Sequence, residues 1–166
     1  MSFVRFSKIA GLAAGAFLLA ACAGYEDSAP VVNDTYEEPS GPVAGSQEDL
    51  EANVGDRIYF AFDRYDLNDA AQATLRRQAA WMKMHPSTTV LIAGNCDERG
   101  TREYNLALGA RRANSAKDFL VSLGVDPARI STISYGKERP TCQGSNEQCW
   151  ALNRNAITSV TGGAGA

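Results

Sequence analysis

Residues 94–119, GNCDERGTREYNLALGARRANSAKDF, decide the fold, because a charged loop in this stretch passes directly into a long helix. An apolar stripe recurs along the predicted helix at spacings of three, four and eight residues. Arg112 follows Leu108 by four positions and so lies inside the stripe. Its guanidinium either reaches water beyond an apolar stem or is held inward by a carboxylate or a ligand. The stripe consists of Tyr104, Leu108, Ala116 and Phe119.

Two further polar residues are expected near Arg112. Asn105 lies two turns earlier on the same helix face, and Asp97 lies in the loop that feeds the helix N-terminus. Backbone amides near Gly100 and Thr101 add donors that suit a carboxylate. Such a site fits a zwitterion, with Arg112 on the carboxylate and Asp97 on the ammonium. An internal salt bridge between Asp97 and Arg112 explains the same residues equally well.

Outward from this stretch, strands and helices alternate, which predicts an α/β (α+β) fold with two main helices packed on a mixed sheet. The expected order is βαβαβ followed by a last strand. Asn68 and Thr101 are expected to cap the two helices, and Pro86 and Gly124 to follow their ends. The predicted strands cover residues 57–62, 88–94, 130–135 and 155–160, and the helices cover residues 68–85 and 101–123.

The first 21 residues have the pattern of a signal peptide, since two basic residues precede an uncharged run that is too short to span a bilayer. The sequence Leu-Ala-Ala before Cys22 resembles the lipobox of bacterial lipoproteins. The resemblance implies that residues 1–21 are removed and that Cys22 carries a diacylglycerol and an N-acyl chain, enough for stable anchoring. Ala23, in place of Asp, implies sorting to the outer membrane. A simple secretory signal with an incidental cysteine is the alternative.

The segment 22–54 is predicted to be an acidic, flexible linker. It carries eight acidic residues and no Lys or Arg, and its composition offers little apolar surface to bury. Without these eight acids and the two basic residues of the signal peptide, the net charge of −3 becomes +3 for the rest of the chain. A domain over residues 55–161 and a disordered tail over 162–166 are expected to follow. So small a positive charge, in an exported chain, argues against a nucleic-acid partner.

The other cysteines suit an oxidising compartment. Cys142 and Cys149 lie seven positions apart in a turn-rich segment and are expected to form a disulfide. Cys96 is expected to be a small buried residue rather than a reactive thiol. With His85 as the only histidine, the sequence supports no metal site, no catalytic His arrangement and no cofactor beyond the lipid. A two-carboxylate glycosidase stays open, because the spatial separation of acids is not encoded in their spacing.

Several motifs along residues 57–160 together resemble the OmpA-like peptidoglycan-binding domain. In chain order they are RIYFAFDRYDLN, GNCDERGT, EYNLALGARRA, ISYGKERP and a final N-R-N. With the lipobox and the acidic segment, the chain is most similar to the lipoprotein members of the family, which belong to the Tol-Pal envelope system. The resemblance implies a non-enzymatic outer-membrane protein that faces the periplasm. It would tether that membrane to the cell wall and support envelope integrity and constriction during cell division.

The resemblance also implies the ligand, which is the meso-diaminopimelate of the peptidoglycan peptide stem. The free end of this residue carries both an amine and a carboxylate, and Asp97 and Arg112 match the family's recognition pair. Asn95 departs from the family, which usually has histidine there, and so does Gly109, where serine is frequent. A protein partner, the periplasmic β-propeller protein TolB, is implied on an overlapping surface. The wider implied pocket contains Phe62, Asp63, Glu98, Arg99, Gly100, Thr101 and Asn105.

Overall fold

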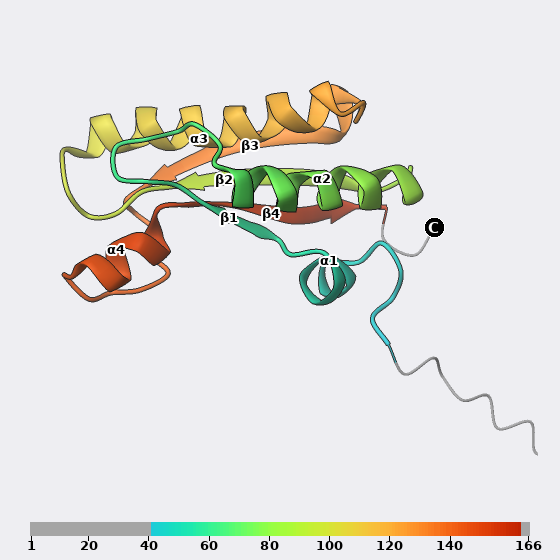
Figure 1. Cartoon of the computed structure of the whole chain (residues 1–166), viewed down its shortest axis with the longest axis horizontal. Coiled ribbons are helices and arrows are strands. Elements are labelled where there is room, and N and C mark those ends of the chain that lie inside the picture. The colour runs from blue at the N-terminus through green and yellow to red at the C-terminus, as the bar shows by residue number, and fades with distance from the viewer. Residues whose placement is uncertain (1–40, 164–166) are drawn as a thin grey trace, which may run out of the picture. The chain divides into compact units, whose positions relative to one another are not determined.

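The computed structural model describes residues 41–163, and the expected mixed sheet with packed helices is confirmed there (Figure 1). The predicted signal peptide, Cys22 and most of the predicted linker lie outside the described residues. None of the helices in the described part is long and apolar enough to cross a membrane. The elements are α1 (Gln47–Asn53), β1 (Arg57–Tyr59), α2 (Asp69–Met84), β2 (Thr89–Asn95), α3 (Arg102–Ser122), η1 (Pro127–Arg129), β3 (Ile130–Gly136), α4 (Glu147–Asn153) and β4 (Asn155–Gly162).

The strands form one sheet in the order β1-β4-β2-β3. β2 and β3 are parallel, whereas β4 lies between β1 and β2 and is antiparallel to both. β1, β2 and β3 therefore run in the same direction, and their carboxyl ends lie at one end of the sheet. Figure 1 shows the loops after β1 and β2, together with α4, at this end. Loops gathered on a rigid sheet in this way commonly carry a binding site.

The two long helices form as the sequence indicates. The side chain of Asn68 accepts a hydrogen bond from Ala71 N, and that of Thr101 accepts one from Tyr104 N, so both predicted N-caps are confirmed. The apolar positions that recur at helical spacing on α2 are buried in the core that α2, α3 and the sheet enclose. These positions are Ala71, Leu75, Ala79 and Met82.

Two glycines allow α3 to lie unusually close to β2. A Cβ atom on Gly94 would collide with the carbonyl oxygen of Gly109, and one on Gly109 would collide with Ser134 Oγ. Ser134 Oγ is itself engaged, because it donates a 2.7 Å hydrogen bond to Leu106 O. A Cβ at position 109 would also come within 2.8 Å of the carbonyl oxygen of Gly94, so a larger residue would not fit against this backbone arrangement. The close approach places the first turns of α3 beside the end of β2, where the polar loop residues lie.

The prediction of a flexible linker up to residue 54 was wrong for its last part, because α1 forms there and packs on the domain. Leu50 is fully buried in the core, and Trp81 Nε1 donates a 2.8 Å hydrogen bond to Asp49 Oδ2. Ser46 caps the helix, and acidic residues in its first turn interact favourably with the helix dipole. Some of the acidic residues that suggested a solvated linker therefore lie in the first turn of a helix, namely Glu48 and Asp49.

Two element boundaries also differ from the prediction. β1 ends at Tyr59 rather than at residue 62, because the chain turns there and Arg64 N donates to Ala61 O at 3.2 Å. The disordered tail was predicted from residue 162, but Gly162 pairs with Thr89 in the ladder between β2 and β4. The pairing between β2 and β4 therefore extends to Thr89, the first residue of β2, and includes the first residue of the predicted tail.

Replacing Leu50 by Ala should lower the free energy of unfolding by about 2–4 kcal/mol, because it leaves a cavity in the core. Urea unfolding followed by circular dichroism measures the effect. Glu51→Ala, an exposed change on the same helix, is the matched control and should stay within about 0.5 kcal/mol of the wild type. Equal stabilities of the two variants would show that α1 does not contribute to the fold.

Candidate functional site

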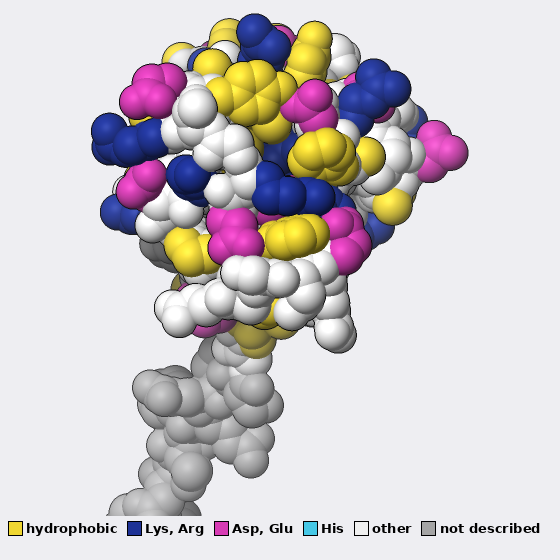
Figure 2. Space-filling view, turned by 90° about the vertical axis from the view of Figure 1, so that its left-hand side faces the viewer, with side chains coloured by type: hydrophobic (Ala, Val, Ile, Leu, Met, Phe, Trp, Pro, Cys, Tyr) yellow, Lys and Arg dark blue, Asp and Glu magenta, His cyan; other side chains and the backbone are white. Residues whose placement is uncertain are grey.

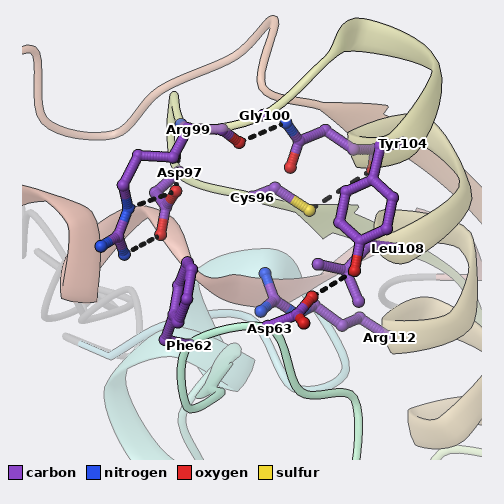
Figure 3. A pocket seen from close by; sticks show the side chains of 10 residues that line it. Phe62, Asp63, Cys96, Asp97, Arg99, Gly100, Tyr104, Leu108 and Arg112 are labelled. Atoms are coloured by element: carbon purple, nitrogen blue, oxygen red, sulfur yellow. Dashed lines mark hydrogen bonds and ion pairs between the residues drawn. The ribbon is translucent and has the colours of Figure 1, made fainter.

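A pocket of about 180 Å³ lies at the carboxyl ends of β1 and β2 (Figure 3). Its walls come from the loop after β1, the loop after β2 and the first three turns of α3. Figure 2 shows this end of the molecule, where basic, acidic and hydrophobic side chains are interspersed. The pocket is lined by Phe62, Asp63, Cys96, Asp97, Arg99, Gly100, Tyr104, Asn105, Leu108 and Arg112.

Arg112 forms the floor of this pocket with a fully buried side chain. Its guanidinium donates to three backbone carbonyls, those of Arg64 at 2.8 Å, Asn95 at 2.8 Å and Ala61 at 3.2 Å. The guanidinium also lies over the ring of Phe60, 5.1 Å from its centroid. Burial lowers the pKa of Arg112 from its usual value.

The guanidinium of Arg112 is held inward, as one of the two sequence-based explanations required, but neither bulk water nor a carboxylate of the described residues is its partner. The side chain does not extend to bulk water, and within residues 41–163 no carboxylate forms a salt bridge with it. The internal pair between Asp97 and Arg112 is therefore not formed. A guanidinium has five N–H donors, and three hydrogen bonds to protein account for three of them. Arg112 thus brings a positive charge to the pocket lining, and the carbonyls leave one N–H on each of Nη1 and Nη2 without an oxygen partner in the described part of the chain, which suits a bidentate carboxylate.

Arg111, the next residue on α3, provides the contrast. It is exposed, and its guanidinium lies 5.8 Å from the ring centroid of Tyr65 on the surface. The helix therefore turns one arginine into the pocket and the other toward solvent, as the position of Arg112 within the apolar stripe predicted.

Asp97 is buried on the opposite wall and is paired with two other arginines. Arg99 donates from Nε to Oδ1 at 3.1 Å and from Nη2 to Oδ2 at 2.7 Å. Arg154 Nη1 donates to Oδ2 at 3.3 Å. Burial by itself would raise the pKa of Asp97, but the hydrogen bonds from Arg99 and Arg154 outweigh it and hold the pKa below its usual value.

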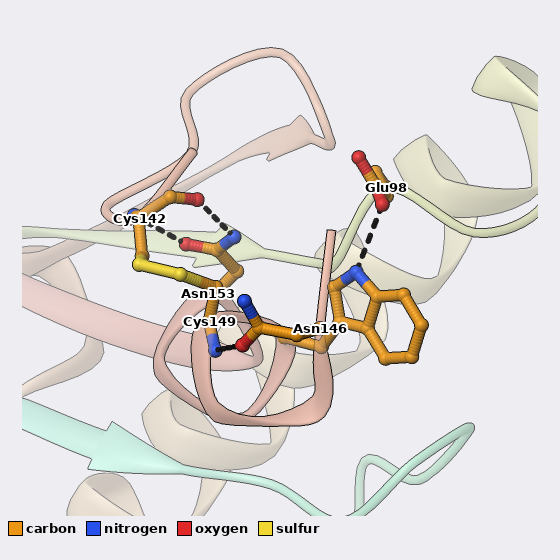
Figure 4. Close-up of a disulfide and its surroundings, with 6 residues drawn as sticks. Glu98, Cys142, Asn146, Cys149 and Asn153 are labelled. Atoms are coloured by element: carbon orange, nitrogen blue, oxygen red, sulfur yellow. Dashed lines mark hydrogen bonds between the residues drawn. A yellow bond between two sulfur atoms is a disulfide. The ribbon is translucent and has the colours of Figure 1, made fainter. Parts of the chain in front are cut away.

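The segment that contains the cysteines lies beside the Asp97 wall of the pocket and contacts it. The sequence suggested only turns in this segment, but it also contains a helix. Its second half is α4, which the side chain of Asn146 caps by accepting from Cys149 N. The expected disulfide between Cys142 and Cys149 is present, with their Cα atoms 5.0 Å apart. Asn153, at the last turn of α4, exchanges two hydrogen bonds with the backbone of Cys142 (Figure 4).

Trp150 in the middle of α4 and Arg154 directly after this helix both reach the loop after β2. Trp150 Nε1 donates a 2.9 Å hydrogen bond to Glu98 Oε1 (Figure 4). Arg154 bridges two acids, since its Nη2 lies 2.7 Å from Glu147 Oε1 while its Nη1 donates to Asp97. Arg154 belongs to the N-R-N motif in the sequence, but nothing in its spacing indicated that it pairs with Asp97.

The loop after β1 contributes the third wall. Asp63 adopts a left-handed backbone conformation with a φ of 57°, which is uncommon for a residue other than glycine. Its carboxylate accepts a hydrogen bond from the hydroxyl of Tyr104, and this bond raises the pKa of the tyrosine. Phe62 precedes Asp63 and is 58% exposed, although its side chain also lines the pocket. The turn also directs the carbonyls of Ala61 and Arg64 at Arg112.

The structure brings seven of the nine predicted pocket residues together and leaves two outside the lining. Glu98 points to Trp150, and Thr101 caps α3. Asn105 lines the pocket but also holds the loop, because its Nδ2 donates to the carbonyls of Arg99 and Thr101. The seven are Phe62, Asp63, Asp97, Arg99, Gly100, Asn105 and Arg112, and the lining residues absent from the predicted set are Cys96, Tyr104 and Leu108.

Neither Cys96 nor Asn95 gives the pocket reactive chemistry. Cys96 is buried as expected, and burial raises the pKa of its thiol to about 11, so the nucleophilic thiolate is not populated near neutral pH. Asn95 donates from Nδ2 to Asn155 Oδ1 at 2.8 Å and does not line the pocket. The departure from the family pattern that was expected at position 95 therefore lies outside the pocket lining. Among residues 41–163, no group of three or more His, Cys, Asp or Glu side chains is placed to hold a metal ion.

Comparison with known proteins places this geometry in a family. Residues 59–154 match the model of the OmpA family. The chain is 54% identical over 121 residues to a peptidoglycan-associated lipoprotein of Agrobacterium fabrum, covering 73% of this chain and 68% of the relative.

Solved structures show the same fold. The crystal structure of the peptidoglycan-associated lipoprotein from Burkholderia pseudomallei is 45% identical, with a TM-score of 0.62 over 64% of this chain and 90% of the other. The C-terminal domain of Helicobacter pylori MotB shares the fold at 20% identity, with a TM-score of 0.61 over 64% and 84% of the two chains.

The lowered pKa of Asp97 predicts a specific loss of stability in acid. Because the folded state favours the ionised carboxylate, this contribution is present above the unfolded-state pKa of about 4 and is lost as the pH falls through the lower folded-state value. Asp97→Asn removes the titrating group. Its free energy of unfolding should therefore be lower than that of the wild type at neutral pH, and the difference should shrink as the pH falls below about 4. Urea unfolding across this range measures it, and a constant difference would contradict the assignment.

Proposed function

Because this chain belongs to the OmpA family, in the group of peptidoglycan-associated lipoproteins, we propose that its pocket binds peptidoglycan. The observation that carries the proposal is the buried guanidinium of Arg112, which has no carboxylate partner among the described residues and lies in the same pocket as Asp97. A buried charge without a counterion is costly, so a ligand carboxylate that supplies the counterion is strongly favoured.

The ligand we propose is the zwitterionic end of meso-diaminopimelate in the peptide stem. Its carboxylate would accept two parallel hydrogen bonds from the N–H groups of Arg112 that the backbone carbonyls leave available. Its ammonium would bind the carboxylate of Asp97 on the facing wall. Lysine, which replaces diaminopimelate in some cell walls, has the ammonium but lacks the carboxylate. The pocket would therefore distinguish the two residues chiefly through Arg112.

We propose binding without chemistry on the polymer. Asp97, the buried acid of the pocket, is engaged by two arginines and has a lowered pKa, which makes it a poor general acid. Asp63 accepts the hydroxyl of Tyr104 rather than facing a second free carboxyl group. The paired carboxylates of a glycosidase, one of them with a raised pKa, are not the arrangement that lines this pocket.

The binding domain would be held at the outer membrane by the lipids on Cys22 and would face the periplasm. One end of the chain would then lie in the membrane and the other on the cell wall, which tethers the two layers. Many copies on one membrane face a continuous polymer, so modest affinity at each pocket suffices for firm attachment. This role fits the support of envelope integrity and constriction during cell division by the Tol-Pal system.

A protein partner, TolB, is proposed on a surface that overlaps the pocket. Two exposed aromatic residues line the pocket, Phe62 at 58% and Tyr104 at 49% exposure, and a third, Tyr65 at 46%, lies three positions after Phe62 in the same loop. Exposed aromatic residues are enriched at protein interfaces. Since Phe62 and Tyr104 also line the pocket, a partner that covers them would compete with the cell wall.

The wild-type chain, solubilised in detergent, should bind a soluble L-Ala-D-Glu-meso-diaminopimelate tripeptide and should bind the tripeptide that ends in L-Lys at least about tenfold more weakly, because Arg112 then lacks its carboxylate. Isothermal titration calorimetry measures both, and co-sedimentation with purified sacculi tests the polymer. Equal affinities for the two peptides would overturn the assignment of Arg112.

Three substitutions test which residues bind the tripeptide. Arg112→Lys keeps the charge but loses the planar fork, and Asp97→Asn loses the charge, so both should weaken tripeptide binding by about tenfold or more. Arg111→Ala is the matched control on the exposed side of α3 and should bind like the wild type. Circular dichroism and thermal unfolding establish that each variant is folded before its affinity is compared.

Replacing Cys22 by Ser should move the chain from the membrane fraction to the soluble periplasmic fraction. The reason is that the proposed acyl chains supply the anchoring free energy, at about 0.8 kcal/mol for each buried CH₂ group. Fractionation and mass spectrometry of the mature N-terminus measure the outcome. A Cys22→Ser chain that remains in the membrane fraction would show that another segment anchors it.

A further inference from the structure

The carboxylate of Asp97 has no free acceptor site in this structure. Oδ1 accepts from the backbone N and the Nε of Arg99, both at 3.1 Å. Oδ2 accepts from Arg99 Nη2 at 2.7 Å and from Arg154 Nη1 at 3.3 Å. A carboxylate offers about four lone-pair sites, and these four hydrogen bonds fill them. An ammonium group can reach Asp97 only if one of the present donors leaves.

Among those donors, the side chain of Arg99 is the one that can leave at low cost. The side chain of Arg154 is only 8% exposed and is also held by Glu147 at 2.7 Å and by the carbonyl of Phe60 at 3.2 Å. The backbone amide of Arg99 is fixed by the loop, whose carbonyl at the same residue accepts from Asn105. The side chain of Arg99 is 31% exposed, and its second acidic neighbour, Glu147, lies at 3.8 Å.

Two aromatic rings hold the guanidinium of Arg99 over the carboxylate. Its central carbon lies 4.1 Å from the ring centroid of Phe62 and 4.1 Å from that of Trp150. Figure 3 shows the guanidinium forked onto Asp97 with Phe62 beside it. Such cation–π contacts are modest at exposed sites, so they favour this position without making it permanent. The same rings would remain as walls for an incoming cation.

We propose that Arg99 is an internal competitor for the ammonium subsite, occupying Asp97 in the free protein and leaving it when the ligand binds. This inference rests on the proposed function and assigns Arg99 a specificity role in it. Exchange of one cation for another keeps Asp97 paired, whereas a neutral ligand group would leave the buried carboxylate underpaired. A ligand that also brings a carboxylate to Arg112 gains a second charged contact with which to displace Arg99. A lone ammonium does not.

Replacing Arg99 by Gln should raise the affinity for the diaminopimelate tripeptide by about three- to tenfold, because the competing charge-assisted hydrogen bonds are removed. Arg99→Lys, a weaker competitor without the fork, should lie between the two. Calorimetry on the full chain measures the three affinities. The matched control is Arg102→Gln, which removes an exposed arginine from the adjoining turn of α3 and should leave binding unchanged.

A second peptide separates competition at Asp97 from a general effect on the pocket. In it, 2-aminopimelate replaces diaminopimelate, which keeps the terminal carboxylate but removes the second amine. Arg99→Gln should leave the affinity for this peptide unchanged, since nothing then displaces Arg99. In the wild type, the indole N–H resonance of Trp150 should also shift on binding the diaminopimelate tripeptide and stay in place with the 2-aminopimelate peptide.

The outcomes distinguish this inference from the proposed function. If the wild type binds the diaminopimelate tripeptide and Arg99→Gln binds it more weakly or equally, Arg99 does not compete, although the pocket still binds the peptide. If both peptides gain affinity in Arg99→Gln, the substitution has changed the pocket generally and the competitor role fails. If neither the wild type nor Arg99→Gln binds, the proposed function itself fails.

Discussion

The burial of one positive charge, on Arg112, is the constraint on which this end of the molecule depends. Placing a charge out of water costs several kcal/mol, and here three carbonyl oxygens offset that cost, two from the loop after β1 and one from the last residue of β2. Two of the carbonyls follow β1 and the third closes β2, so Arg112 fixes both loops to α3. The loops gain a defined shape from the interaction, and that shape is what forms the pocket.

Asp97 is held differently, because its partners are the charged guanidinium groups of Arg99 and Arg154 rather than backbone groups alone. Two acids, Asp97 and Glu147, alternate with Arg99 and Arg154 across the boundary between the β2 loop and α4. The network is attached at two places, because Arg154 directly precedes β4 and Glu147 belongs to α4, which the disulfide between Cys142 and Cys149 links to the preceding loop. The facing walls therefore differ in kind. Arg112 is rigid and buried, whereas the Asp97 wall contains one arginine that remains partly exposed.

The sequence was sufficient for the parts of the fold that periodicity and capping encode. It placed both long helices, their N-caps and the arginine that interrupts an apolar stripe. It could not show which groups face Arg112, because every residue has a backbone carbonyl and the residue types do not reveal its direction. Here that direction depends on a turn in which Asp63 has a left-handed backbone conformation. It also misjudged α1, since eight like charges suggested a solvated segment while a single buried residue, Leu50, determines the packing.

The proposed competition by Arg99 would have a consequence for the proposed tethering role. An internal competitor would lower the affinity of each pocket for every ligand that needs Asp97. Each single contact with the cell wall would therefore form and break readily. Firm attachment would then arise from the number of copies on the membrane rather than from any one pocket. A tether built in this way could shift along the polymer without detaching the membrane, whereas a pocket with an unoccupied, preorganised carboxylate at Asp97 would release each contact more slowly.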